Sequence, residues 1–254
     1  MNTQDVMVLE WTFSPPDYFE EPVSISRDDY QITIRDGKVE ARMESVVYES
    51  IPALKDTIEN ALNQRFRAVE LLTQRAYALS YARRLRLHPD GHKEFFITAS
   101  DSIALRDSVD IRATDRNGNV VYDSRKERIK RQTELADLAE KHGSRDPLAR
   151  SILASYHAAV EDPDNELVHL YEIRDALAKE FGGEKQACNE LGIGRGIRSE
   201  LGRLADNEPI KQGRHRGKFA GKLRDATESE LERGREIARN LVTAYLRFLE
   251  RNVH

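Results

Sequence analysis

Residues 23–45 read VSISRDDYQITIRDGKVEARMES, and this stretch decides the class of fold. Its apolar residues recur at every second position on both sides of the dipeptide Asp36-Gly37. Such alternation is typical of strands with one buried face, and Asp-Gly between two such runs is a strong signal for a two-residue hairpin turn. The alternating residues are Val23, Ile25, Ile32, Ile34, Val39 and Ala41. We therefore predict an antiparallel hairpin here.

The rest of the first half combines further strands with one long helix. Residues 6–13 are β-prone, and strand character returns between residues 81 and 124. Residues 51–80 carry apolar side chains three or four positions apart, which is the spacing of an amphipathic helix. These side chains are Leu54, Ile58, Leu62, Phe66, Val69 and Leu72. The pattern predicts a β-rich N-terminal domain over residues 1–128, with a long helix at about residues 51–80.

One of the later strands is unusually basic. It carries Arg83, Arg84, Arg86 and His88 within a few positions. These side chains could extend a basic face on the protein. Charged residues are also common on strands at the edge of a sheet, where they discourage pairing with another molecule. We interpret this segment as a charged edge strand.

The second half of the chain is helical in pattern. The predicted helices are residues 125–143, 146–163, 165–183 and 227–252. Asp146 before Pro147 is a typical helix start, because Asp caps the first turn and Pro suits its first position. Ser229 and Glu232 have the spacing of a capping box near the start of the last helix. We predict an all-helical domain over residues 129–254 and an α+β protein as a whole.

Composition excludes several classes of protein. The formal net charge of -4 and the pI near 6.0 argue against binding of polyanions by the whole surface. The single cysteine, Cys188, excludes an internal disulfide framework and a multi-cysteine metal site. The sequence has no membrane-length apolar run and no signal-peptide pattern, so we expect a cytoplasmic protein. P-loop, GxSxG, HExxH and CxxC motifs are also missing from it, which leaves NTPase, hydrolase and zinc-protease chemistry without support.

A dense basic block lies between two helical segments. Residues 211–224 read KQGRHRGKFAGKLR, with six Lys or Arg, one His and no acid. Arg and Lys bind phosphate through charge-assisted hydrogen bonds, and His215 adds a side chain that exchanges protons near neutral pH. We predict a site for the phosphates of RNA or a nucleotide, formed by Lys211, Arg214, Arg216, Lys218, Lys222 and Arg224. A solvated mobile loop and a docking surface for an acidic protein remain open alternatives.

Residues 184–204, just before this block, have the layout of a helix-turn-helix. Two short helical segments flank Gly192, where a positive φ is expected. In such a motif the second helix enters the DNA major groove, and here Arg195 and Arg198 would contact bases or backbone. A helical pair that packs between longer helices is the alternative interpretation.

Four elements follow one another in the C-terminal half. They are a helix with Leu170-Tyr171-Glu172-Ile173 that exits at Gly182-Gly183, a short insertion with Leu191-Gly192-Ile193, the junction Arg214-His215-Arg216-Gly217, and a long helix with Ala238, Leu241, Tyr245 and Leu249. In this order, residues 166–250 resemble the HEPN superfamily, small helical domains of prokaryotic toxins, phage-defence proteins and RNA-processing nucleases. The resemblance rests on layout and covers about a third of the chain.

The resemblance implies a helical, dimer-forming domain that is associated with RNA. HEPN ribonucleases cut RNA without metal, using a His near the last helical hairpin and an Arg a few residues before it. His215 matches the His. Lys211 and Gln212 stand roughly where the family has its Arg, and a lysine holds phosphate as a point charge without the planar fork of arginine.

These observations predict an RNA- or nucleotide-binding protein, with metal-independent ribonuclease or effector activity in stress or phage defence. If RNA is cut, His215 acts as general acid or base while Lys211, Arg214 and Arg216 neutralise phosphate charge. A non-catalytic homodimeric scaffold and a helix-turn-helix DNA-binding regulator remain alternatives. The N-terminal domain is a candidate surface for a protein partner.

We expect neither a cofactor nor a metal site. His169 and Glu172 are three positions apart, on one face of a predicted helix. Pairs of this kind are more often hydrogen-bond partners at the surface than metal ligands. The sequence alone thus points to phosphate binding and acid–base chemistry, both in the basic block.

Overall fold

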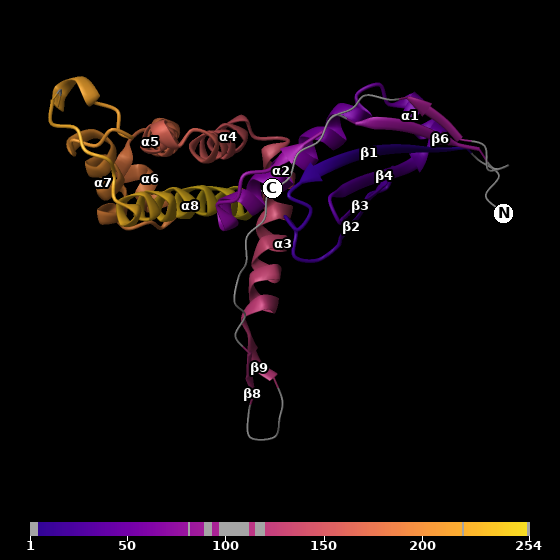
Figure 1. Ribbon diagram of the computed structural model, residues 1–254, viewed down its shortest axis with the longest axis horizontal. Coiled ribbons are helices and arrows are strands. Elements are labelled where there is room, and N and C mark those ends of the chain that lie inside the picture. The colour runs from indigo at the N-terminus through magenta and orange to yellow at the C-terminus, as the bar shows by residue number, and fades with distance from the viewer. Residues whose placement is uncertain are drawn as a thin grey trace. The chain divides into compact units, whose positions relative to one another are not determined.

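The computed structural model describes residues 5–80, 82–88, 93–96, 112–114, 120–219 and 221–252. An antiparallel sheet comes first and helices dominate the rest, which confirms the predicted α+β class (Figure 1). The chain divides into a sheet unit, residues 1–59 with 77–131, and a helical unit, residues 60–76 with 132–254. The prediction of 1–128 and 129–254 did not foresee that residues 60–76, from the first half, belong with the helices.

The sheet unit is built around β1. The strands are β1 (Val6–Ser14), β2 (Val23–Ser26), β3 (Gln31–Arg35), β4 (Lys38–Glu44), β5 (Ala78–Leu79), β6 (Arg83–Leu87) and β7 (Lys93–Phe96). Their order across the sheet is β2-β3-β4-β1-β6-β7, with all neighbours antiparallel, and β5 pairs with the end of β1. β1 therefore lies inside the sheet, bonded to β4 on one side and to β6 on the other.

The hairpin predicted at Asp36-Gly37 is present as β3 and β4. Arg35 pairs with Lys38, and Asp36 and Gly37 between them have φ values of 51° and 76°. Two positive φ values are the signature of a type I′ turn, whose twist matches that of the flanking strands. The alternation is confirmed too, because five of its six apolar members are buried while most of their neighbours face solvent. The buried members are Ile25, Ile32, Ile34, Val39 and Ala41.

The interpretation of residues 83–88 as an edge strand was wrong. β6 pairs with both β1 and β7, so it lies within the sheet. Basic side chains are tolerated there because they alternate with apolar ones, among which Leu85 is buried. Arg86 pairs with Glu49 of α1 (Ser45–Ser50), and His88 Nδ1 lies 3.1 Å from Asp5 Oδ1. Arg86 and His88 thus contact acidic side chains rather than forming a basic face.

The long helix α2 (Leu54–Thr73) is shorter than the predicted range of about 51–80. The predicted apolar positions Leu54, Ile58, Leu62, Phe66 and Val69 are all buried. The helix ends where Gln74 takes a positive φ of 55°, and the chain then pairs with β1 as β5. Residues 74–80 contain neither Gly nor Pro, so the sequence carries no local stop signal there.

A second, two-stranded sheet precedes the helical half. β8 (Arg112–Thr114) pairs with β9 (Val120–Asp123), and α3 (Ser124–Gly143) follows directly. α3 agrees with the helix predicted over residues 125–143. The strands predicted within residues 97–111 lie outside the described residues.

The helical unit surrounds one continuous core. Its main helices are α4 (Pro147–Glu161), α5 (Glu166–Glu180), α6 (Glu184–Leu191), α7 (Arg195–Gly202) and α8 (Glu228–Arg251). α8 runs along α4 and α5, and α6 and α7 pack near its N-terminal part (Figure 1). The predicted stripe of α5 is confirmed, because Leu167, Leu170, Tyr171, Ile173, Arg174 and Leu177 are buried. None of the described helices has the length and apolar character needed to cross a membrane.

The start of α4 is also as predicted. The Asp146 side chain accepts a hydrogen bond of 2.7 Å from the amide of Ala149, and Pro147 occupies the first turn. The cap satisfies one of the amides that a helix start leaves without a helical partner. The hydroxyl of Tyr245 on α8 also donates to this carboxylate, over 3.3 Å, so the cap links two helices of the unit.

Candidate phosphate-binding site around His215

The basic loop, residues 211–224, begins and ends at one place in the helical unit. The amide of Lys211 donates to the carbonyl of Arg224 over 2.9 Å, and the amide of Arg224 donates to the carbonyl of Pro209 over 2.9 Å. These bonds close the loop at its base. Its two ends therefore have defined positions next to the start of α8.

A π-helical turn, Arg203–Asn207, receives the first part of the loop. Its Ala205 carbonyl accepts a hydrogen bond of 2.8 Å from the amide of Arg214. A Cβ added to Gly213 would lie 2.7 Å from that carbonyl oxygen, so this close approach requires glycine. π-helical turns are rare and occur frequently at functional sites. Here the turn carries Asp206 to the loop.

Asp206 and His215 form the centre of the candidate site. His215 Nε2 lies 3.5 Å from Asp206 Oδ1, and the histidine side chain is 55% exposed while the aspartate is 21% exposed. Asp206 Oδ1 is buried without a hydrogen-bond partner among the described residues. A carboxylate behind an exposed imidazole can orient the ring and stabilise its protonated form, the arrangement that acid–base catalysis uses.

Arg214 is held beside this pair by α5. Its guanidinium carbon lies 4.3 Å from the centroid of the Tyr171 ring, and its Nη1 lies 3.2 Å from Asp175 Oδ2 and 3.9 Å from Asp206 Oδ1. A cation over an aromatic face is attracted by the ring quadrupole. Arg214 is thus fixed in orientation next to His215, which is what binding of a phosphate oxygen requires.

The ring of Tyr171 packs against the guanidinium groups of Arg214 and Arg174 at the site. Its hydroxyl accepts a hydrogen bond of 2.6 Å from Arg174 Nη1, and the Arg174 guanidinium carbon lies 4.8 Å from the ring centroid. Burial raises the pKa of the Tyr171 hydroxyl, and the Asp206 carboxylate adds to this shift. Tyr171 therefore stays protonated at neutral pH and acts as a platform for the two arginines.

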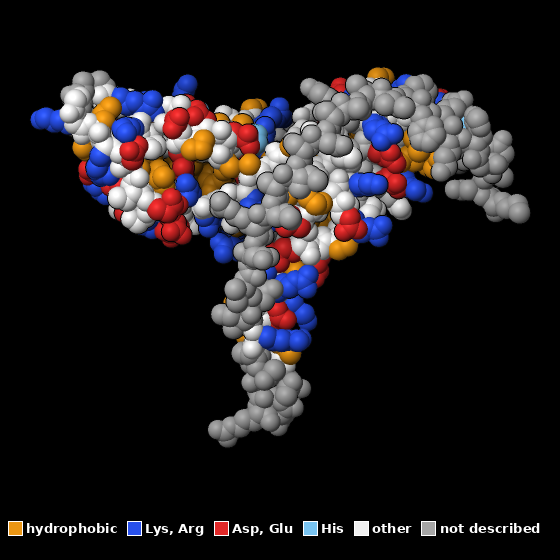
Figure 2. Space-filling model, in the orientation of Figure 1, with side chains coloured by type: hydrophobic (Ala, Val, Ile, Leu, Met, Phe, Trp, Pro, Cys, Tyr) orange, Lys and Arg blue, Asp and Glu red, His pale blue; other side chains and the backbone are white. Residues whose placement is uncertain are grey.

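Lys211 and Arg216, which were also predicted as phosphate ligands, are engaged elsewhere. Lys211 Nζ pairs with Asp225 over 2.9 Å and lowers the pKa of that carboxyl. Arg216 Nη2 donates to the Asp164 carbonyl over 2.8 Å and to Asn165 Oδ1 over 2.6 Å. Lys218 and Lys222 are exposed on the loop. Figure 2 shows the same interleaving of basic and acidic side chains on the visible face of the helical unit.

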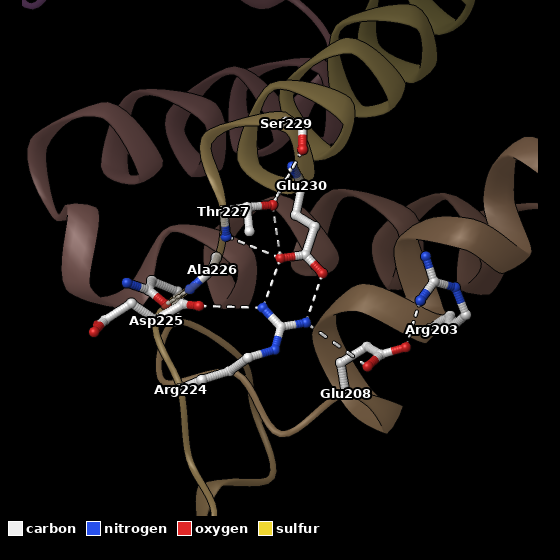
Figure 3. Close-up of polar contacts among 9 residues, drawn as sticks. Arg203, Glu208, Arg224, Asp225, Ala226, Thr227, Ser229 and Glu230 are labelled. Atoms are coloured by element: carbon white, nitrogen blue, oxygen red, sulfur yellow. Dashed lines mark hydrogen bonds and ion pairs between the residues drawn. The ribbon is translucent and has the colours of Figure 1, made fainter.

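Arg224 belongs to the cap of α8 (Figure 3). Its guanidinium makes two bonds of 2.7 Å to the carboxylate of Glu230. The capping box consists of Thr227 and Glu230, so the predicted pair Ser229 and Glu232 was wrong by two positions. The bond from Arg224, with further bonds from Thr227, lowers the pKa of Glu230 to about 2. Arg224 is thereby a structural residue at the helix start.

The structure brings His215 and Arg214 together and adds residues that the sequence did not reveal. Asp206, Tyr171 and Asp175 complete the site, and Asp175 is 39 positions away from Arg214. Separations of this size carry no local signal. Arg174, which fell in the apolar phase of the predicted helix, was the one available hint, because a buried arginine needs a partner.

The predicted helix-turn-helix layout is present as α6, a turn and α7. Gly192 has a positive φ of 66°, as expected. Cys188 and Leu201 are buried, and Glu200 of α7 pairs with Arg233 of α8 over 2.8 Å. α7 thus packs on α8 through part of its surface. The side chains of Arg195 and Arg198 lie outside the described residues.

His169, considered above as half of a metal pair, makes local contacts. Its Nε2 lies 3.3 Å from Asp162 Oδ2, and its Nδ1 lies 3.9 Å from Glu172 Oε2. The neighbouring Glu166 is buried and bound by Arg235, with a bond of 2.8 Å from Nη2. Asp162 and Glu172 thus lie on either side of His169, whereas Glu166 is engaged by Arg235.

Comparison with known proteins gives no relative from which a function could be inferred. No family model matches the chain, and neither a curated protein nor a solved structure matches it. The function of the site is therefore argued from the side chains that the fold brings together.

Proposed function

We propose that the helical unit is a HEPN-like domain that binds RNA or a nucleotide at His215 and Arg214. The observation that carries the proposal is an exposed imidazole backed by the Asp206 carboxylate, with a stacked arginine beside it. Arg214 supplies a planar, permanently charged group for a phosphate oxygen. His215 supplies a proton donor or acceptor on the same side of the loop.

The same geometry supports cleavage of RNA. His215 takes the proton of a ribose 2′-hydroxyl as the 2′ oxygen bonds to the adjacent phosphorus, and the bond from phosphorus to the 5′ oxygen breaks. Arg214 stabilises the negative charge that builds on the phosphoryl oxygens. Asp206, 3.5 Å from His215 Nε2, keeps the imidazole oriented, and the leaving oxygen takes a proton from solvent. Each of these steps proceeds without a metal ion.

Cleavage of a labelled single-stranded RNA in EDTA, from about pH 5 to about pH 9, tests the proposal. Replacement His215→Ala should lower the rate about 10²- to 10⁴-fold, the usual loss for a general acid or base. RNA binding should fall little, because Arg214 remains. The matched control is His169→Ala, which removes a histidine of the same unit outside the site and should cleave like wild type.

Two outcomes would count against catalysis. If wild type leaves RNA intact, or if His215→Ala cleaves equally well, the chain is better described by the scaffold alternative. In that case the HEPN resemblance still implies a homodimer, which light scattering of the purified protein would detect. Absence of both RNA binding and nucleotide binding by wild type would overturn the proposal altogether.

DNA binding is the second candidate function. It is favoured by two short helices, α6 and α7, with Gly192 in a left-handed conformation between them. Duplex DNA would then displace single-stranded RNA from the protein. Arg195→Ala and Arg198→Ala should weaken DNA binding while His215→Ala leaves it unchanged. Normal DNA binding by both arginine variants would exclude this reading of α7.

A further inference from the structure

A second cluster of titratable side chains lies in the helical unit, between α2 and α4. It consists of Glu70 from α2 with His157 and Glu161 from α4, and we call it the Glu–His cluster. One ligand atom from each residue lies within 4.8 Å of the other two. Glu70 is fully buried, His157 is 28% exposed, and Glu161 is exposed.

Helical geometry places two of the three donors on one face. His157 and Glu161 are four positions apart on α4, so their side chains point to the same side of the helix. Glu70 faces them from α2 in a segment whose neighbours Val69 and Leu71 are core residues. A carboxylate in such a segment is costly unless a cation compensates it.

The charges of the cluster call for a cation. Burial raises the pKa of Glu70, the bond to His157 opposes this shift, and the nearby Glu161 carboxylate adds to it by repulsion. Arg67, one turn earlier on α2, also favours the ionised carboxylate. Two carboxylates that repel each other, one of them buried, are groups that a divalent cation would bring together.

The distances fit shared coordination of a divalent ion. His157 Nδ1 lies 2.9 Å from one Glu70 oxygen and 3.1 Å from the other. Two donors at about 2.1 Å from a tetrahedral zinc ion are about 3.4 Å apart, so His157 and Glu70 need to separate by only a few tenths of an ångström to admit the ion. The observed separation also suits a hydrogen bond, so the third donor distinguishes the two cases. Glu161 supplies that third donor, because its ligand atom lies within 4.8 Å of those of Glu70 and His157.

We propose that Glu70, His157 and Glu161 bind a Zn²⁺ ion. Imidazole nitrogen and carboxylate oxygen are both ordinary zinc ligands, and three protein ligands leave a fourth position for water. The partial exposure of His157 and the exposure of Glu161 provide an entry path from solvent. The proposed site differs from the expectation of no metal. Glu70 and His157 are 87 positions apart, so no spacing within the sequence pairs them.

The experiment uses the full chain, freed of metal with EDTA and then dialysed. Calorimetric titration with Zn²⁺ should show one ion bound per chain, and Zn²⁺ should raise the melting temperature of wild type. Glu161→Gln should weaken binding at least about tenfold, and His157→Gln should abolish it. Because Glu161 is exposed, its replacement leaves the core intact. The matched controls are Glu172→Gln and His169→Gln on α5, which should bind Zn²⁺ like wild type.

Two results would overturn the proposal. The first is a wild-type protein that binds no stoichiometric Zn²⁺ at micromolar concentrations. The second is binding that survives both His157→Gln and Glu161→Gln unchanged, which would place the ion elsewhere. Circular dichroism of each variant shows whether it is folded. If a variant is unfolded, the Zn²⁺ titration of wild type alone decides the proposal. None of these measurements involves RNA, so their outcome is independent of the function proposed for His215.

Discussion

The basic loop and the Glu–His cluster concentrate charge in opposite ways. In the loop, six cations stand close together in sequence, but the fold brings Asp225, Asp175 and Glu230 to three of them. In the cluster, no local density is visible, and two helices bring Glu70 to His157 from 87 positions away. The charge density of the sequence therefore overstates the positive potential of the folded basic loop. It gives no indication of the Glu–His cluster.

The largest expected effect tests whether the loop is docked. Gly213→Ala would place a Cβ 2.7 Å from the Ala205 carbonyl oxygen, so either the loop or the π-helical turn must shift. We expect a loss of about 1–3 kcal/mol in the free energy of unfolding, the usual cost of overpacking. Urea denaturation measures this loss, and RNA binding should weaken with it, because Arg214 is the next residue.

The control for this variant is Gly196→Ala. Gly196 lies in α7, and a Cβ there would meet nothing within 4 Å. Alanine in a helix should be neutral or stabilising by up to about 1 kcal/mol. Equal stability of the two variants would mean that the loop is a solvated segment. The acids of the fold would then not hold the loop cations in place.

The pairing of the loop with α8 has a pH signature. The pKa of Glu230 is lowered to about 2 by Arg224, so its contribution to stability is complete above the ordinary value near 4.5 and is lost as pH falls toward 2. We expect Glu230→Gln to cost about 1 kcal/mol at neutral pH, since the carboxylate is near the surface and also caps the helix.

Urea denaturation of wild type and Glu230→Gln at several pH values measures this effect. The difference between the two proteins should shrink as pH falls from about 5 to about 2. Glu232→Gln is the matched control, because Glu232 lies outside the observed capping box. A constant difference over the whole range would show that Arg224 is free to bind other anions.

The smallest effect separates the loop cations from one another. Arg214→Ala should reduce the slope of log affinity for single-stranded RNA against log salt by about 0.7, the value for one lost phosphate contact. Arg224→Ala should leave the slope unchanged, because both of its Nη atoms bond to Glu230 over 2.7 Å, whereas Arg214 contacts Asp175 through Nη1 over 3.2 Å. Filter binding at several salt concentrations measures both. Equal slopes for the two variants would contradict the distinction, and Glu161→Gln should alter neither affinity nor slope.

Local signals predicted the elements well. The Asp36-Gly37 turn, the buried stripe of α5 and the Asp146 cap each depend on residues within a turn or two of one another. The end of α2 depended on a partner farther away, namely β1. The register of the capping box was missed although Arg224, Thr227 and Glu230 lie within six positions of one another. The candidate site was half predictable, because His215 and Arg214 are adjacent in sequence whereas Asp206 and Tyr171 arrive only through folding.

The position of β1 inside the sheet has a consequence for synthesis of the protein. Val6 pairs with Glu44 on one side and with Leu87 on the other. On the ribosome, β1 can pair with the β3–β4 hairpin early, but its other edge must wait until β6 has been made. At about 5–20 residues per second this wait lasts roughly a few seconds. During that time the nascent chain presents an open strand edge, to which a chaperone or another nascent chain can add.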